Sequence, residues 1–217
     1  AFAGCFDAPS LIRTVPRILT HGLTNVNILD LAPEDNTMPR FANFVDFIPR
    51  FSTSCAQLIE GVSKDEDPSH TVAWTIIGSP LATVAMPLVL LPNDKLPETV
   101  GRGTTGGSAL CRYGLKLKER LFPLRTKTRS SYIDVAQLVN RKGNGILQLI
   151  RPIEDELMDK GTALVNDLRN EKEGNEKGDN KKNGNEKNVY KAFADYYSWA
   201  DGVIKEQYEK GVLKVKK

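Results

Sequence analysis

The alternation of apolar and polar residues is clearest between Arg50 and Leu91, and there it predicts three β-strands. The first two runs alternate with a period of two, which is typical of strands that bury one face. The third is apolar at nearly every position, as in a strand covered on both faces, although Pro87 favours an edge or a bulge. The three runs are residues 52–62, 71–77 and 82–91. Only short links join them, so we expect an α+β fold in which an antiparallel three-strand meander is flanked by helices.

Residues 1–49 are expected to approach this sheet through short helices and loops. One helix is predicted to start at Ser10, whose hydroxyl can cap it, and a second at Thr24, running to Leu31. Aromatic residues then recur at every third position, which favours a turn that presses rings onto the core. They are Phe41, Phe44 and Phe47.

Residues 108–170 are predicted to be mainly helical. A glycine-rich stretch at 101–107 precedes them, and it is interpreted as a linker because it lacks the lysine of a phosphate-binding loop. Ser108 is expected to cap a helix that ends before Pro123, and Asp134 to cap a shorter element.

Two long helices are predicted from apolar stripes at helical spacing, over residues 146–170 and 189–211. Pro152 and Gly161 can break or kink the first of them. The segment 171–188 repeats the motif GNEK and carries no apolar residue to offset the entropy of ordering, so we predict a disordered insert.

Composition narrows the possible functions. We interpret the 217 residues as a single, partial domain. A net charge of +3 is too small to favour a nucleic-acid partner. No run of about 18 apolar residues predicts a membrane span, and no signal peptide is visible. The cysteines, Cys5, Cys55 and Cys111, lack metal-ligand spacing, and nothing in the sequence indicates a metal or a cofactor.

Three consecutive carboxylates, Glu154, Asp155 and Glu156, are the nearest approach to a catalytic acid–base pair. Consecutive helix positions point in different directions, so a solvated acidic turn is the better interpretation. Lys160 lies four residues after Glu156 and is expected to pair with it.

The candidate substrate-binding residues lie at the start of the predicted sheet. Arg50 can meet a carboxylate, and Ser52, Thr53 and Ser54 supply small hydroxyls beside it, with Trp74 as an apolar wall. The alternative stays open that serine and threonine simply populate a strand entry, where they bond the local backbone.

Five stretches resemble one family. They are RFSTSCAQLIEGV, WTIIGSPLATVAMPL, SALCRYGLKLKERLFP, YIDVAQLVNRKGNGILQLIRPIEDELMDKG and YYSWADGVIKEQYEKG, and they cover about Arg50 to Gly211. The chain is similar to the C-terminal half of acyl-coenzyme A:6-aminopenicillanic acid acyltransferase-like proteins. These are cysteine-type N-terminal-nucleophile hydrolases related to the choloylglycine hydrolases.

The resemblance implies part of an αββα sandwich and a linear-amide hydrolase or acyltransferase that acts on a small acyl amide. It also implies a secreted or periplasmic location. In such proteins an N-terminal cysteine attacks the amide carbonyl, its α-amino group acts as base, and an asparagine helps to hold the oxyanion. Both residues are expected upstream of Ala1, on the same polypeptide or on a second chain. The given residues would then be inactive alone.

Cys5 is the weaker, internal candidate for the nucleophile. Cleavage of the Gly4–Cys5 bond would expose a terminal cysteine, but the residues that follow favour a loop entering a helix instead of an apolar strand. Two non-enzymatic alternatives remain open. The chain can be a structural or interaction module of the same fold, or an unrelated soluble α+β binding protein.

Overall fold

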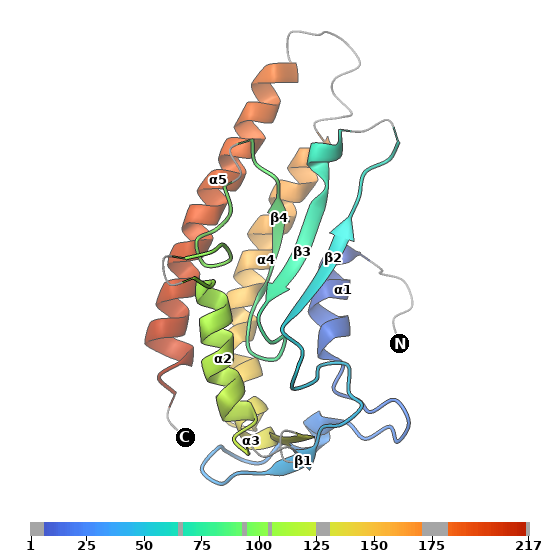
Figure 1. The fold of residues 1–217 in the computed structure, drawn as a ribbon, viewed down its shortest axis with the longest axis vertical. Coiled ribbons are helices and arrows are strands. Elements are labelled where there is room, and N and C mark those ends of the chain that lie inside the picture. The colour runs from blue at the N-terminus through green and yellow to red at the C-terminus, as the bar shows by residue number, and fades with distance from the viewer. Residues whose placement is uncertain are drawn as a thin grey trace.

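The chain folds as a mixed arrangement of helices around a three-stranded antiparallel sheet (Figure 1). The long helices α4 (Ile146–Asn170) and α5 (Lys182–Gln207) run side by side. In this view α4 and the short helix α1 (Ala8–Thr14) pass behind the sheet. The computed structural model describes residues 7–64, 67–92, 95–103, 106–124, 131–170 and 182–215, and for 182–187 it describes the backbone alone.

The predicted meander is confirmed, with shorter strands than the alternation suggested. The strands are β2 (Cys55–Glu60), β3 (Val72–Ile77) and β4 (Ala85–Val89), in the order β2-β3-β4. The third strand starts late because Ala82 and Thr83 both donate backbone hydrogen bonds to Ser79 and so form a turn. Pro87 lies on β4, an edge strand of this sheet, where its missing N–H removes no pairing from the ladder.

The N-terminal helix starts earlier than the sequence predicted. α1 (Ala8–Thr14) is capped by Asp7, which accepts from the backbone N–H of Ser10. Pro9 therefore occupies the first turn, where its missing N–H is tolerated. A 3₁₀ turn, η1 (Val15–Arg17), continues α1, because Pro16 cannot donate to an α-helical ladder.

The predicted helix from Thr24 is reduced to the 3₁₀ turn η2 (Ile28–Leu31), capped by Asn27. A small sheet that the sequence did not predict follows. It pairs β1 (Phe41–Asn43) with β5 (Tyr132–Asp134) in antiparallel register.

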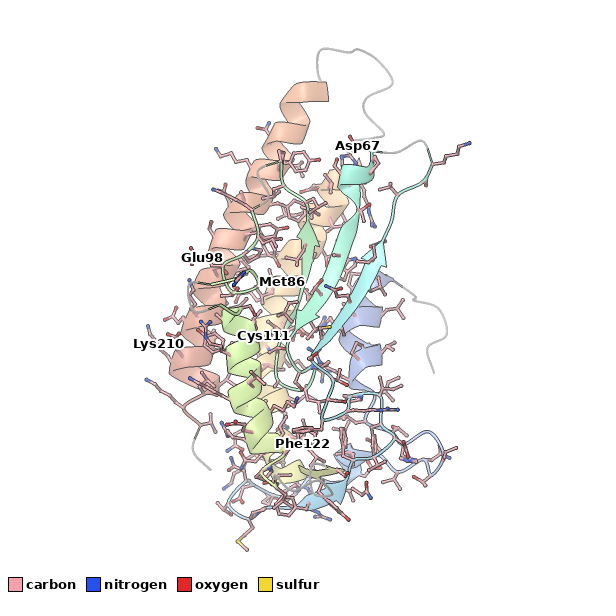
Figure 2. All side chains as sticks on the ribbon, in the orientation of Figure 1. Asp67, Met86, Glu98, Cys111, Phe122 and Lys210 are labelled. Carbon is pink, nitrogen blue, oxygen red and sulfur yellow. The ribbon has the colours of Figure 1, made fainter. Side chains whose placement is uncertain are left out.

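Aromatic rings pack beneath this small sheet. Phe44 and Phe47 are buried and stacked with ring centroids 4.5 Å apart, as the spacing predicted, whereas Phe41 is 43% exposed. Phe122, which is labelled in Figure 2, follows the last residue of α2 (Ala109–Leu121). Its ring contacts those of Phe44 and Phe51.

The helices after the sheet follow the predicted caps. Ser108 caps α2 (Ala109–Leu121), and Asp134 caps α3 (Val135–Leu138). A 3₁₀ turn, η3 (Pro68–His70), leads into β3. α2 packs on the turn between β3 and β4, so closely that a Cβ on Gly114 would lie 2.8 Å from the Thr83 methyl group.

α4 (Ile146–Asn170) continues through both Pro152 and Gly161. α5 (Lys182–Gln207) starts before the predicted 189 and ends in a π-helical turn, η5 (Tyr208–Val212). The predicted disordered insert, 171–188, falls outside the described residues as far as residue 181, and for 182–188 the prediction is wrong, because these residues form the start of α5.

α5 covers the edge of the sheet at β4. The Tyr197 hydroxyl accepts from the N–H of Val89 at 2.7 Å and donates to the carbonyl of Val89 at 3.0 Å. Asp201, one turn further along, accepts from the backbone N–H groups of Glu98 and Thr99. The β4 edge is therefore closed by a side chain, as an edge strand requires.

The two faces of the main sheet differ in how far other parts of the chain cover them. The face behind the sheet carries Trp74 and Pro87 and packs on α1 and α4. The opposite face, which Figure 1 shows from the front, is open along β2, and we call it the open face. It carries Cys55, Gln57 and Ile59, all exposed, and Ile59 is 62% exposed.

Candidate functional site

The predicted substrate-binding residues fall at one end of the open face. Arg50, Ser52 and Ser54 are exposed, and Thr53 is half-buried. The Thr53 hydroxyl accepts from the Arg50 N–H at 2.9 Å, and the Ser54 carbonyl accepts from Gly78 at 2.9 Å. The segment is thus a fixed turn at the entry of β2.

Trp74 lies apart from that turn. It stands opposite Leu58 in the ladder, four positions beyond Ser54, which is about 13 Å along a strand. Its ring is buried on the face that packs against α1 and α4, and its indole N–H donates to Glu60 at 2.8 Å. The structure therefore brings the arginine and the hydroxyls together, but it does not bring Trp74 beside them.

Cys55 and Cys111 are free thiols, exposed and half-buried respectively. Cys55 is therefore not a core residue, because it lies on the open face. Neither thiol has a hydrogen-bonded acid or base within the described part of the chain. Cys5, the internal nucleophile candidate, lies outside the described residues.

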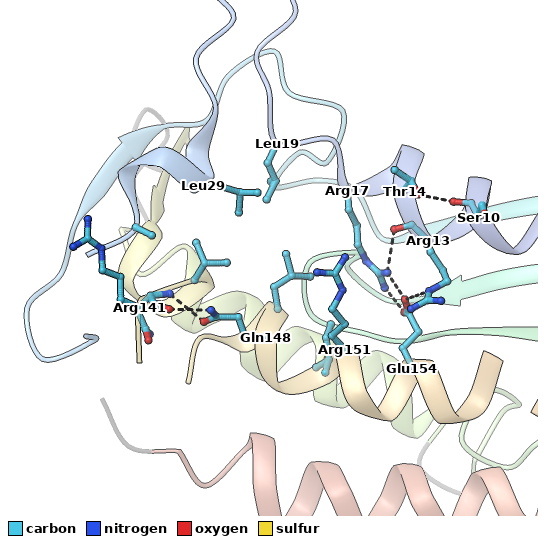
Figure 3. A pocket seen from close by; sticks show the side chains of 15 residues that line it. Ser10, Arg13, Thr14, Arg17, Leu19, Leu29, Arg141, Gln148, Arg151 and Glu154 are labelled. Carbon is cyan, nitrogen blue, oxygen red and sulfur yellow. Dashed lines mark hydrogen bonds and ion pairs between the residues drawn. The ribbon is translucent and has the colours of Figure 1, made fainter. Parts of the chain in front are cut away.

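One cavity lies on the other side of the sheet, between α1, η2, α3 and α4, with a volume of about 620 Å³. We call it the arginine pocket, because four arginines line it together with one carboxylate and an apolar wall (Figure 3). The arginines are Arg13, Arg17, Arg141 and Arg151, and the carboxylate is Glu154.

Glu154 corrects the prediction of a solvated acidic turn, because it is buried at 2% exposure. Its two carboxylate oxygens accept from Arg17 at 2.6 and 2.5 Å, from Arg13 at 3.3 Å, and from the backbone N–H of Ala85 at 2.7 Å. A buried carboxylate is tolerated only with such partners. The neighbouring Asp155 pairs with Arg13, and Glu156 pairs with Lys160 as predicted.

Arg17 uses its whole guanidinium for structure. Besides Glu154 it donates to the carbonyls of Pro80 at 2.7 Å and Thr83 at 2.9 Å. These contacts fasten η1 to the turn before β4. No sequence motif marks them, because the partners lie 63 to 137 residues apart.

Gln148 and Asn140 form the end of the pocket beside α3. The Gln148 amide accepts from the N–H groups of Asn140 and Gly145, both at 3.1 Å, and donates to the Asn140 carbonyl at 2.9 Å. A Cβ on Gly145 would lie 2.5 Å from the Leu138 carbonyl, so only glycine fits this turn. The amide groups of Gln148 and Asn140 therefore hold the turn between α3 and α4.

Arg151 differs from the other polar residues that line the pocket. It is exposed, projects from α4 into the space between α4 and η1 in Figure 3, and makes no hydrogen bond or ion pair with the residues that the structure describes. Arg141 is nearly as free, since its contact with Glu34 is 3.9 Å long and both side chains are over 70% exposed.

Two further cavities are of similar size. One, of about 580 Å³, lies over Trp74 between α1 and α4; the other, of about 680 Å³, lies beside β1. Glu60 lies near the first. Burial raises the pKa of its carboxyl group, but hydrogen bonds from Arg169 and Trp74 outweigh burial and hold that pKa below its ordinary value.

Comparison with known proteins gives no match for this chain, whether with family models, with curated proteins or with solved structures. Within the described part of the chain, no helix has the length and apolar character needed to cross a membrane.

Proposed function

We propose that this chain is the C-terminal, supporting part of a linear-amide hydrolase or acyltransferase of the N-terminal-nucleophile type. Its nucleophilic cysteine is expected upstream of Ala1, on a layer that packs against the open face. The observation that carries the proposal is the unequal cover of the sheet, which has helices on one face and an exposed strand on the other.

An αββα sandwich requires this arrangement of each of its sheets, with helices outside and the second sheet inside. The open face along β2 suits an inner surface, because it carries Ile59 and the small side chain of Cys55. Burying Ile59 beneath a second sheet would contribute about 1.5–3 kcal/mol. The resemblance of residues 50–211 to the acyltransferase-like family supports the same layering.

The turn at Arg50 is the expected contact with substrate in the completed protein. It lies at one end of the open face, where its guanidinium is exposed and can pair with a carboxylate. The hydroxyls of Ser52 and Thr53 lie within the same turn. In this proposal they position a small acyl amide, while the upstream cysteine attacks its carbonyl and the cysteine amino group takes the thiol proton.

An activity assay tests the assignment of the nucleophile. Residues 1–217 are purified and incubated with a panel of small N-acyl amides, beside the Cys5→Ala variant. We expect no turnover by either protein. Turnover that Cys5→Ala abolishes would place the nucleophile within this chain and overturn the proposal.

The alternative, a non-catalytic module of the same fold, is tested with the protein purified from its natural source. We expect that protein to hydrolyse at least one acyl amide in the panel, and iodoacetamide to abolish the activity. A natural protein that hydrolyses none of them would favour the interaction module.

A further inference from the structure

We propose that the arginine pocket binds an amphipathic carboxylate, namely a carboxylic acid with an unbranched apolar tail. This goes beyond the proposed amide hydrolysis and does not rest on it, because the pocket lies on the side of the sheet away from the open face. The inference rests on the charge balance, the apolar wall and the volume of the cavity.

The charges in the pocket do not cancel. Arg13 and Arg17 are matched by Glu154 and Asp155, through the ion pairs described above. Arg151 then remains without a partner among the described residues, in a cavity that also has an apolar wall. A guanidinium in this setting can meet a carboxylate with two parallel hydrogen bonds.

The position of Arg151 follows from the helix that carries it. Gln148, Arg151 and Glu154 recur every three residues along α4, so neighbouring members lie one turn apart, and all three line the pocket. Gln148 is held by the α3–α4 turn and Glu154 by Arg17, which leaves Arg151 as the free group between two fixed ones. It is therefore the polar anchor that a ligand would meet.

The wall around this anchor is apolar. Six side chains supply it, and the cavity volume of about 620 Å³ falls in the range that accommodates small organic ligands. They are Leu19, Leu29, Ala32, Val139, Leu147 and Ile150. With one unpaired cation, Arg151, beside this wall and only a weakly paired second one, Arg141, the site is suited to a negatively charged head group and an alkyl tail. Arg141, nearer the solvent, adds attraction at longer range.

Titration calorimetry of residues 1–217 with decanoate tests the proposal. We expect saturable binding with one site per chain, weakened at least tenfold in Arg151→Gln, because a hydrogen bond to a charged group is lost. The matched control is Arg102→Gln, which removes an exposed arginine outside the pocket and should leave the affinity unchanged. Arg151 is itself exposed, so we expect its variant to unfold at the same urea concentration as the parent chain.

The tail is tested by chain length. Affinity should rise about fourfold for each methylene group from hexanoate to decanoate, as each one leaves water for the apolar wall. Inorganic phosphate should compete weakly or not at all. The proposal is overturned by an absence of saturable decanoate binding, by equal affinity in Arg151→Gln, or by affinity that does not depend on chain length. Phosphate that binds more tightly than decanoate would overturn it in favour of a phosphate site.

Discussion

The guanidinium of Arg17 donates two hydrogen bonds to the carboxylate of Glu154, at 2.6 and 2.5 Å, across 137 residues of sequence. The pair is buried, since the side chains are 9% and 3% exposed. It joins η1 to α4, and through the N–H of Ala85 it also fixes the first residue of β4. Three separate parts of the chain therefore depend on a single carboxylate.

Removal of this carboxylate should be strongly destabilising. Glu154→Gln leaves the Arg17 charge buried without its counter-ion, and we expect the free energy of unfolding to fall by about 3–5 kcal/mol. Urea denaturation measures the loss. Glu156→Gln is the control, because its ion pair with Lys160 is exposed and contributes less than about 0.5 kcal/mol. Equal effects of the two changes would show that the Arg17–Glu154 pair is not a structural anchor.

Two helical glycines should respond to alanine in opposite directions. A Cβ on Gly161 would lie 2.4 Å from the Pro87 ring and 2.9 Å from the Tyr196 hydroxyl oxygen, whereas a Cβ on Gly202 meets nothing within 4 Å. Gly161→Ala should therefore lower the free energy of unfolding by about 1–3 kcal/mol, through overpacking between α4 and β4.

Gly202→Ala should raise the free energy of unfolding by about 0.5–1 kcal/mol, because alanine favours the helix and space is available. Thermal unfolding of both variants gives the comparison. A stabilising Gly161→Ala would mean that α4 lies further from Pro87 than the structure places it.

Stability should decline at alkaline pH, partly because of Tyr197. Burial raises the pKa of its phenol to about 12. The hydrogen bond from the Val89 N–H favours the phenolate and lowers this pKa, but burial has the larger effect. A tyrosine in the unfolded chain has a pKa near 10. Between about pH 10 and 12 the folded state keeps the proton that the unfolded chain loses. The contribution of the Tyr197 phenol to the free energy of unfolding is therefore fully present below pH 10, and it is lost as the pH rises toward 12.

Tyr197→Phe isolates this contribution. The variant should reduce the alkaline slope of unfolding free energy by up to about 1.4 kcal/mol per pH unit, measured by urea denaturation between pH 9.5 and 11.5. It should also cost about 1–3 kcal/mol at neutral pH, because Val89 loses both of its partners. An unchanged alkaline slope would contradict the linkage.

The strands and the helix caps that depend on neighbouring residues could be predicted from the sequence. Two alternating runs and one continuous apolar run predicted the three strands and their order. Ser108 and Asp134 could be identified as caps because capping needs only the next few residues. The Ser10 cap was wrong by the same reasoning, because Asp7 competes with it and Pro9 fits the first turn.

Features that depend on distant partners could not be predicted. The pairing of β1 with β5 joins segments about 90 residues apart, and three-residue strands carry too little alternation to be recognised. The acidic neighbours of Glu154 in the sequence favour a solvated turn, whereas its neighbours in space are Arg13 and Arg17. The arginine pocket was missed for the same reason.

The accessibility of Cys55 tests the central claim most directly, namely that a further layer covers the open face. Iodoacetamide labelling, with mass spectrometry to locate each label, is applied to residues 1–217 and to the protein purified from its natural source. Cys111, which is half-buried and lies on α2, serves as the internal reference. We predict that Cys55 reacts readily in the isolated chain and at least tenfold more slowly, relative to Cys111, in the natural protein. Equal relative reactivity of Cys55 in the two proteins would contradict the account.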